Sequence, residues 1–219
     1  MLQDLLDRYR MTKLDKLDWI TRNRLNVKKE KKMFSRSIQK HQNLKSKQNI
    51  LFWATGAWER GALEHMLAFS LLLRGHKIQG VRCAGGFSAC SMESCHFKRP
   101  NCDDCVDRSK RLLDVFGIEE YYKTTQDFLS EEEIRFCDSE IDGLHVDDFL
   151  SYTYKGYSIG EWVKRDLPQY YFRIMDIKDP KETERIRKIL KSTLMYTISA
   201  VNAVEKIKPD RCCVTSGKT

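Results

Sequence analysis

The sequence predicts an α/β fold, in which a Rossmann-like parallel sheet with flanking helices follows a basic helical N-terminal arm. Three observations support this prediction. An apolar strand, a helix, a glycine stop and a second strand follow one another within about 35 residues, which is the order of a βαβ unit. Helical patterns dominate the second half of the chain. The excess of positive charge falls in the first 48 residues, outside the βαβ unit.

The βαβ unit starts at Asn49. The run 49–54 is short and apolar, as in a buried strand. Segment 61–74 has helical length and strong helix formers, and Gly75 provides a C-terminal stop. A broad apolar face of this helix is formed by Leu63, Met66, Leu67, Ser70, Leu71 and Leu73. Segment 77–83 predicts the second strand, joined to the first by a right-handed crossover.

The later elements are mostly helical. Val106 to Phe116 predicts a helix that Gly117 ends, and Ser130 with the three glutamates after it forms a capping box that starts another. Two longer helices are expected over 158–175 and 180–207. A short final strand is expected over 211–215.

The net charge of +8 comes from an N-terminal arm and linker over residues 1–48, which carry fourteen basic and five acidic side chains. The remaining residues, 49–219, form a nearly neutral domain. Apolar residues recur in the arm at spacings of three and four, so its first part predicts an amphipathic helix with a basic face. Three interpretations stay open: a solvated helix folded back on the domain, a contact with an anionic membrane surface, or a contact with nucleic acid. Specific nucleic-acid binding is the least expected, because the arm matches no recognised motif.

The sequence contains no run of 18 apolar residues and no secretory signal pattern at its start. Cytoplasmic localisation is therefore expected, with possible peripheral attachment to the cytoplasmic membrane face through residues 1–48. Eight cysteines in 219 residues are too few for a disulfide scaffold, so thiols or metal ligands are expected instead.

In a parallel sheet, ligands bind outside the carboxyl ends of the strands. The loop after the first strand, TGAWERG over residues 55–61, lacks the glycine spacing of a dinucleotide fingerprint. The C-terminal SGKT is similar to the end of a Walker A loop, but Cys212 stands where that motif requires glycine. Neither loop supports a nucleotide-binding motif.

A cysteine-rich segment carries the densest chemistry of the sequence. Four thiols within sixteen residues, the number of ligands of a tetrahedral zinc site, come from Cys90, Cys95, Cys102 and Cys105. They predict a structural zinc ion or an iron–sulfur cluster, and reduced thiols or an occasional disulfide remain the alternative. Core positions are expected for the other four cysteines, which are Cys83, Cys137, Cys212 and Cys213.

The order of these segments resembles a known family. The strand ILFWA, the helix ending in Arg74-Gly75-His76 and the strand KIQGV are similar to the opening of the acceptor-side Rossmann domain of GT-B glycosyltransferases. The cysteine-rich loop and the later YKGYSIGE, over residues 154–161, are similar to segments of bacterial surface-carbohydrate and capsule-type enzymes of that class. The resemblance covers residues 49–215 and implies half of a GT-B architecture.

The resemblance implies a nucleotide-sugar donor and a glycan or lipid-linked acceptor, in surface polysaccharide or glycoconjugate biosynthesis. In GT-B enzymes a second Rossmann domain binds the donor, and no residues remain here to build it. The resemblance therefore predicts a chain truncated before the donor domain and inactive without the C-terminal half.

Inverting sugar transfer needs a base for the acceptor hydroxyl proton. The groups expected nearest the cleft are Glu59 on the first loop, followed by His65 and Glu64 on the first helical turn. Either glutamate could instead serve only the helix dipole. Expected substrate contacts are Gly56, Trp58 and Gly156, although Trp58 could simply close the core.

A second class of function remains open on the same residues. In that hypothesis, the chain is a noncatalytic α/β binding module, held by a metal-bound loop, for nucleic acid or a protein partner.

Overall fold

The computed structural model describes residues 48–54, 59–90, 102–171 and 179–214, together with Lys32 and Arg36 in the N-terminal region. The first half of the described chain contains β1 (Asn49–Ala54), α3 (Glu59–Leu73), β2 (Lys77–Arg82), α5 (Cys102–Phe116), η1 (Glu119–Tyr121), β3 (Tyr122–Thr124) and η2 (Thr125–Phe128). The second half contains α6 (Glu131–Asp142), η3 (Val146–Asp148), α7 (Ile159–Tyr171), α8 (Pro180–Ile207) and β4 (Arg211–Val214). The strands β1 and β4, although far apart in the sequence, belong to one sheet.

The four strands pair in parallel in the order β3-β2-β1-β4. This confirms the predicted α/β class with a parallel sheet and flanking helices. The order is that of the first four strands of the Rossmann fold, in which the direction of strand addition reverses beside β1. Because all four strands are parallel, the segments after β1, β2 and β4 all leave from the same edge, here called the carboxyl edge.

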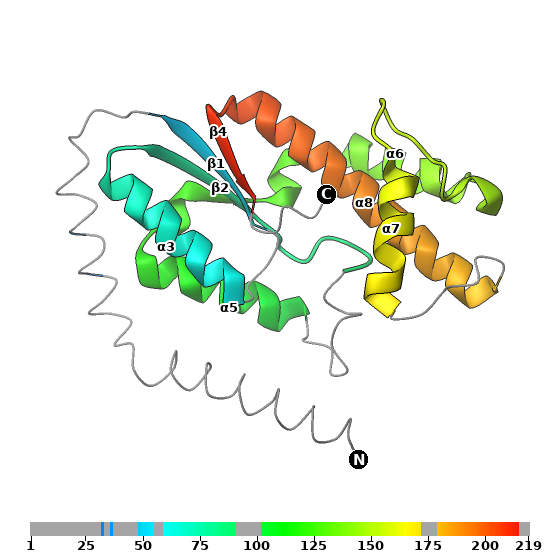
Figure 1. Ribbon diagram of the computed structural model, residues 1–219, viewed down its shortest axis with the longest axis horizontal. Coiled ribbons are helices and arrows are strands. Elements are labelled where there is room, and N and C mark those ends of the chain that lie inside the picture. Colours follow the sequence, from blue (N-terminus) through cyan, green and yellow to red (C-terminus); the bar gives the residue numbers. More distant parts are fainter. Residues whose placement is uncertain are drawn as a thin grey trace, which may run out of the picture.

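Helices cover both faces of the sheet (Figure 1). On one face, Phe52 and Ile78 pack with Ala68 and Phe69 of α3 and Leu113 of α5. On the other face the side chains of β1 and β2 pack against α8. Strands β1 and β2 are therefore buried on both sides, which explains why the run 49–54 is mostly apolar.

A second apolar core lies away from the sheet, between α8 and the helices α6 and α7 (Figure 1). Its fully buried side chains include Phe149, Ile159 and Leu190. Helix α8 has 28 residues, which is long enough to contribute one end to this core and the other to the sheet. The helix-rich second half of the chain is thus joined to the sheet through α8.

Most predicted elements are confirmed, and a few bounds differ. The helix predicted from Val106 begins at Cys102, so the polar CDDC segment forms its first turn. The helix predicted from residue 158 begins at Ile159 and is described to Tyr171. Strand β3 was not predicted, because it has only three residues. The capping box at Ser130 is confirmed, with Glu133 accepting from the Ser130 backbone N–H at 2.8 Å.

No helix among the described residues is long and apolar enough to cross a membrane. The predicted arm, residues 1–48, lies almost entirely outside the described residues, and so do the predicted contact residues Gly56 and Trp58.

Candidate functional site

Glu64 is the predicted catalytic residue that the structure places most clearly. It lies on the second turn of α3, a helix that begins at Glu59, and not on the first turn as expected. Its side chain is only 6% exposed, and Oε1 is buried with no hydrogen-bond partner among the described residues. Burial raises its pKa from 4.5 to about 7. A carboxyl group with this pKa can take up or release a proton near neutral pH.

Titratable groups from three other elements surround Glu64. Its carboxylate adds to the rise in pKa that burial causes at Tyr122 on β3, Tyr196 on α8 and Cys213 on β4. The register explains two of these neighbours, because Tyr122 and Cys213 lie in one lateral row of the sheet with Gly80 and Phe52. Helix α3 brings Glu64 over this row.

His65 is more deeply buried than its neighbour, with 1% of the side chain exposed. Its ring meets the ring of Tyr122 edge-on at a centroid distance of 5.4 Å. Neither ring nitrogen has a hydrogen-bond partner among the described residues. Burial lowers the pKa of His65 from 6.5 to about 4, so the imidazole is neutral at neutral pH. The imidazole of His65, one of the predicted catalytic groups, is therefore a weaker base in the fold than an exposed histidine.

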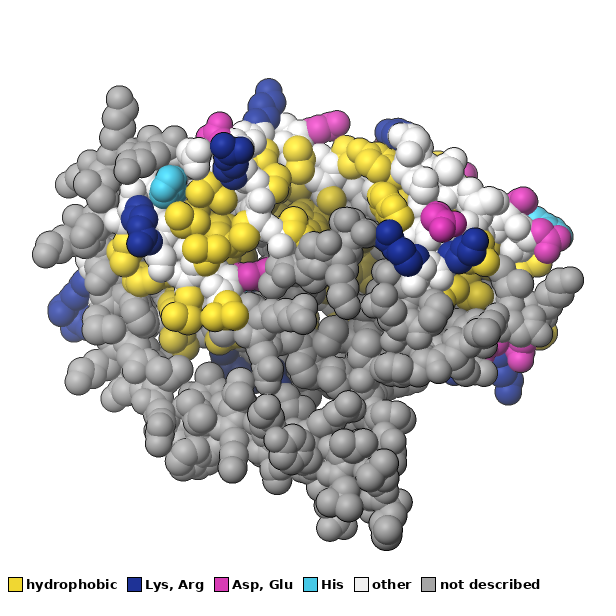
Figure 2. Space-filling model, viewed as in Figure 1, with side chains coloured by type: hydrophobic (Ala, Val, Ile, Leu, Met, Phe, Trp, Pro, Cys, Tyr) yellow, Lys and Arg dark blue, Asp and Glu magenta, His cyan; other side chains and the backbone are white. Residues whose placement is uncertain are grey.

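Helix α3 buries two polar side chains, Glu64 and His65, beside its apolar core residues Ala68 and Phe69, and leaves other apolar residues exposed. On the side opposite Glu64 and His65, Leu63 is 67% exposed, Met66 52% and Leu67 45%. Figure 2 shows hydrophobic side chains gathered on the surface over α3. The expected apolar face of this helix is therefore only partly used in the core, whereas a carboxyl and an imidazole occupy buried positions.

Glu59 does not occupy a loop, contrary to expectation. It is the first residue of α3, and its side chain is outside the described part of the structure. An acidic residue at this position interacts favourably with the positive end of the helix dipole.

Gly156 occupies an exposed turn between Tyr154 and Tyr157, whose backbones pair as an antiparallel bridge. Lys155 and Gly156 both have positive φ angles, 49° and 85°. Two such residues in sequence are typical of a tight type I′ turn, which favours glycine. The backbone conformation thus explains this glycine without a substrate contact.

Three of the four predicted metal ligands lie in the described chain, and Cys95 does not. Cys90 ends the described segment after β2, while Cys102 and Cys105 lie on the first turn of α5. No group of three or more His, Cys, Asp or Glu side chains is arranged to hold a metal ion within the described ranges. The predicted ligand set is therefore only partly visible.

Cys83 joins these thiols, although the sequence placed it in the core. It follows the last residue of β2 and is half-buried. Burial raises its pKa to about 11, and the thiols of Cys90, Cys102 and Cys105 contribute to that rise. Its position at the end of the second strand was the signal that could have assigned it to the site. We refer to Cys83, Cys90, Cys102 and Cys105 as the cysteine cluster.

The remaining cysteines divide as follows. Cys137 is fully buried in the core of α6, α7 and α8, as expected. Cys213 is half-buried and packs against the core under α3, whereas Cys212 is exposed. The core prediction for Cys212 is wrong, because β4 is an edge strand and most of its residues are exposed.

Tyr196 also has a role that the sequence did not indicate. The indole N–H of Trp53 donates a hydrogen bond to the Tyr196 hydroxyl, and the two rings meet edge-on at 5.2 Å. The ring of Phe87, from the segment after β2, also meets the Tyr196 ring, at a centroid distance of 5.9 Å. Tyr196 thus links α8 to β1 and to the segment that leads to Cys90.

Comparison with known proteins gave no matching family model, no similar curated protein and no similar solved structure.

Proposed function

We propose that this chain is the acceptor-side half of a GT-B-type glycosyltransferase that uses a nucleotide-sugar donor in surface polysaccharide or glycoconjugate biosynthesis. Glu64 is the proposed general base. The observation that carries this proposal is the buried carboxyl of Glu64, which has an unpartnered oxygen and a pKa of about 7. The sequence resemblance provides the class of reaction.

The role of Glu64 as general base follows from the raised pKa of its carboxyl group. An acceptor hydroxyl must lose its proton as it attacks the anomeric carbon, and a carboxylate within hydrogen-bond distance can accept that proton. A base with a pKa near the working pH combines adequate basicity with a sufficient ionised fraction. Glu64 meets this condition, whereas His65, with a pKa of about 4, is a weak base.

The proposal is tested by nucleoside diphosphate release from a panel of nucleotide sugars, with glycan and lipid-linked acceptors. We expect no release from the 219-residue chain alone, because one domain cannot orient both reactants. Release is expected when the chain is part of a longer polypeptide that adds a donor-binding Rossmann domain. Transfer by the chain alone would overturn the division into halves, and no transfer by the two-domain form would overturn the proposed reaction.

The base is tested in the two-domain form with Glu64→Gln and the matched variant Glu59→Gln. Glu64→Gln should lower kcat by about 10²–10⁴-fold, the usual contribution of a general base. Glu59→Gln should leave kcat within about twofold of wild type, because a charge at the start of a helix contributes chiefly to helix stability. The reverse result would restore Glu59 as the base.

The basic arm supports a location for this activity at an anionic membrane face. Residues 1–48 carry nine more basic than acidic side chains and an apolar stripe. Both features favour adsorption to anionic lipid. The full chain should sediment with anionic vesicles and not with neutral ones, and removal of residues 1–48 should abolish sedimentation. Sedimentation that survives the deletion would place the contact elsewhere.

The gathering of cysteines beside α5 favours a second candidate, the noncatalytic metal-bound binding module. It predicts binding of nucleic acid or a protein partner by the chain, without sugar transfer in any longer form. The transfer assay above decides between the two candidates.

A further inference from the structure

A glycine after β2 brings two cysteines from different elements together. The backbone N–H of Gly85 donates a hydrogen bond to Cys83 Sγ at 3.4 Å. Gly85 has a φ of +84°, and a Cβ built on it would lie 2.9 Å from Cys102 Sγ. The sulfur atoms of Cys83 and Cys102 therefore both lie against the backbone of Gly85, which is the close approach that this glycine permits.

Two cysteines share the first turn of α5. Cys102 is the first residue of the helix and Cys105 the fourth, so their side chains project from the same side. The N-terminal end of a helix favours the thiolate form of a cysteine, because the backbone N–H groups and the helix dipole stabilise negative charge.

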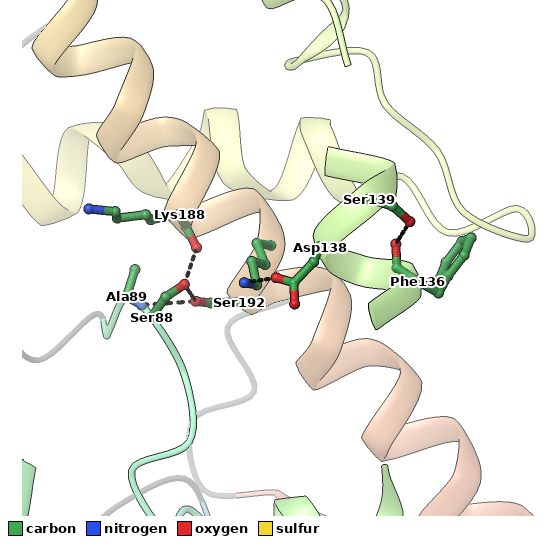
Figure 3. A network of polar contacts seen from close by, with 8 residues as sticks. Ser88, Ala89, Phe136, Asp138, Ser139, Lys188 and Ser192 are labelled. Atoms are coloured by element: carbon green, nitrogen blue, oxygen red, sulfur yellow. Dashed lines mark hydrogen bonds and ion pairs between the residues drawn. The ribbon is translucent and has the colours of Figure 1, made fainter. Parts of the chain in front are cut away.

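The segment that leads from β2 to Cys90 is held against α8, as Figure 3 shows. The backbone N–H of Ala89 donates to the Ser192 hydroxyl at 2.9 Å, and the hydroxyls of Ser88 and Ser192 lie 3.2 Å apart. Ser192 itself is buried. These hydrogen bonds hold Ser88 and Ala89 against α8. Cys90 follows them directly and so lies, like Cys83, in the segment that leaves the carboxyl edge of the sheet after β2.

We propose that Cys83, Cys90, Cys102 and Cys105 bind one zinc ion, with Cys83 in the position that sequence spacing gives to Cys95. Four sulfur ligands complete a tetrahedral zinc site and leave no position for water, so the ion is structural. Binding converts four thiols to thiolates, releases four protons and changes no oxidation state.

Among the described residues no group of three or more such side chains is arranged to hold a metal ion, so zinc binding requires other rotamers of the four cysteines that bring each sulfur to about 2.3 Å from the ion. A bound divalent cation supplies the charge that stabilises the thiolate form of its cysteine ligands. The site is independent of the proposed sugar transfer.

The test measures zinc per chain in the full-length protein, after removal of metal and dialysis against zinc. Wild type, Cys95→Ser and the exposed control Cys212→Ser should each retain about one zinc, as one tetrahedral site requires. Cys83→Ser and Cys105→Ser should retain none, with circular dichroism to establish that the sheet and helices remain. Loss of zinc in Cys95→Ser with retention in Cys83→Ser would overturn the assignment of Cys83.

A second measurement needs no variant. Wild type is treated with a thiol-alkylating reagent with and without zinc, and modified cysteines are identified by mass spectrometry. Zinc should slow alkylation of all four cysteines of the cluster by at least about tenfold while leaving Cys95 and Cys212 unchanged. Equal alkylation of Cys83 in the two conditions, an absence of bound zinc, or an iron–sulfur chromophore in its place would overturn the proposal.

Discussion

The ring of Tyr122 lies against the backbone of Gly80 so closely that a Cβ on Gly80 would overlap three atoms of the ring. The two residues are register partners on β3 and β2. The ring extends over β2 toward α3, where it meets His65 edge-on. Because Gly80 on β2 has no side chain, the Tyr122 ring from the edge strand β3 can reach His65 in the buried part of the candidate site.

Gly80→Ala is expected to lower the free energy of unfolding by about 1–3 kcal/mol, the usual cost of an overpacked core position. The methyl group must displace the Tyr122 ring, which has little room under α3. Urea denaturation measures the effect. The matched control is the same substitution in a Tyr122→Leu background, where the loss should fall to less than half. Equal losses in the two backgrounds would show that the ring is not the obstacle.

Glu64→Gln should stabilise the protein above neutral pH. Burial raises the folded-state pKa of Glu64 from 4.5 to about 7, so the folded chain keeps a proton that the unfolded chain loses between these values. The wild-type free energy of unfolding therefore falls as pH rises through this interval and then levels off. Glutamine does not titrate, so the variant should gain about 3 kcal/mol over wild type at pH 8 and almost nothing at pH 4.

The measurement is urea denaturation of the two proteins at several pH values between 4 and 8. A gain in stability combined with a loss of kcat is what a catalytic carboxyl held in an unfavourable site requires. A stability difference that does not change with pH would contradict the raised pKa of Glu64.

His65 has the opposite dependence on pH. Burial lowers its folded-state pKa from 6.5 to about 4, so the unfolded chain takes up a proton on acidification before the folded chain does. Its contribution to stability is present above about 6.5 and is lost as pH falls toward 4. His65→Leu removes this loss, and it also removes two ring nitrogens that have no partner among the described residues.

We therefore expect His65→Leu to raise the free energy of unfolding by about 1 kcal/mol at pH 7 and by about 3 kcal/mol at pH 5. Thermal unfolding at the two pH values gives the comparison, with wild type as the reference. A variant that is less stable than wild type at pH 7 would mean that a buried nitrogen of His65 makes a hydrogen bond important to the fold.

The order of strands and helices could be predicted because local pattern and burial agree over most of the chain. The run 49–54 is apolar because the sheet is covered on both faces, and α8 begins at Pro180 and ends at Ile207 as its helix signals indicate. Strand β3 could not be predicted, because three residues carry no periodicity. The start of α5 was missed because its first turn, from Cys102 to Cys105, contains no apolar periodicity apart from the cysteines themselves.

The candidate site was harder to predict because it departs from the same pattern. Periodicity in α3 favours an inward position for Leu63 and Met66, but the chain buries Glu64 and His65 instead. Cys83 was assigned to the core because it follows an apolar strand, whereas its neighbours in space come from α5, about 20 residues later in the chain. Contacts between distant segments, which spacing alone does not reveal, define both parts of the site.

Asn49 provides a prediction remote from the site, at the amino end of β1. Its side-chain amide donates to the Ile207 carbonyl at 2.9 Å, and its side-chain oxygen accepts from Gln79 at 3.3 Å. Its backbone N–H donates to Asp210 at 2.7 Å. The side-chain amide also donates to the Lys208 carbonyl at 3.4 Å. Asn49→Ala keeps the backbone bond and loses the three side-chain bonds, so the free energy of unfolding should fall by about 1–2 kcal/mol. Asn49→Asp should cost at least as much, because its carboxylate would face the Ile207 carbonyl and lie near Asp210.

Urea denaturation measures both variants, and zinc per chain should stay at the wild-type value because the cysteine cluster lies at the opposite end of β2. A variant within about 0.5 kcal/mol of wild type would show that these bonds do not hold β1 to the end of α8.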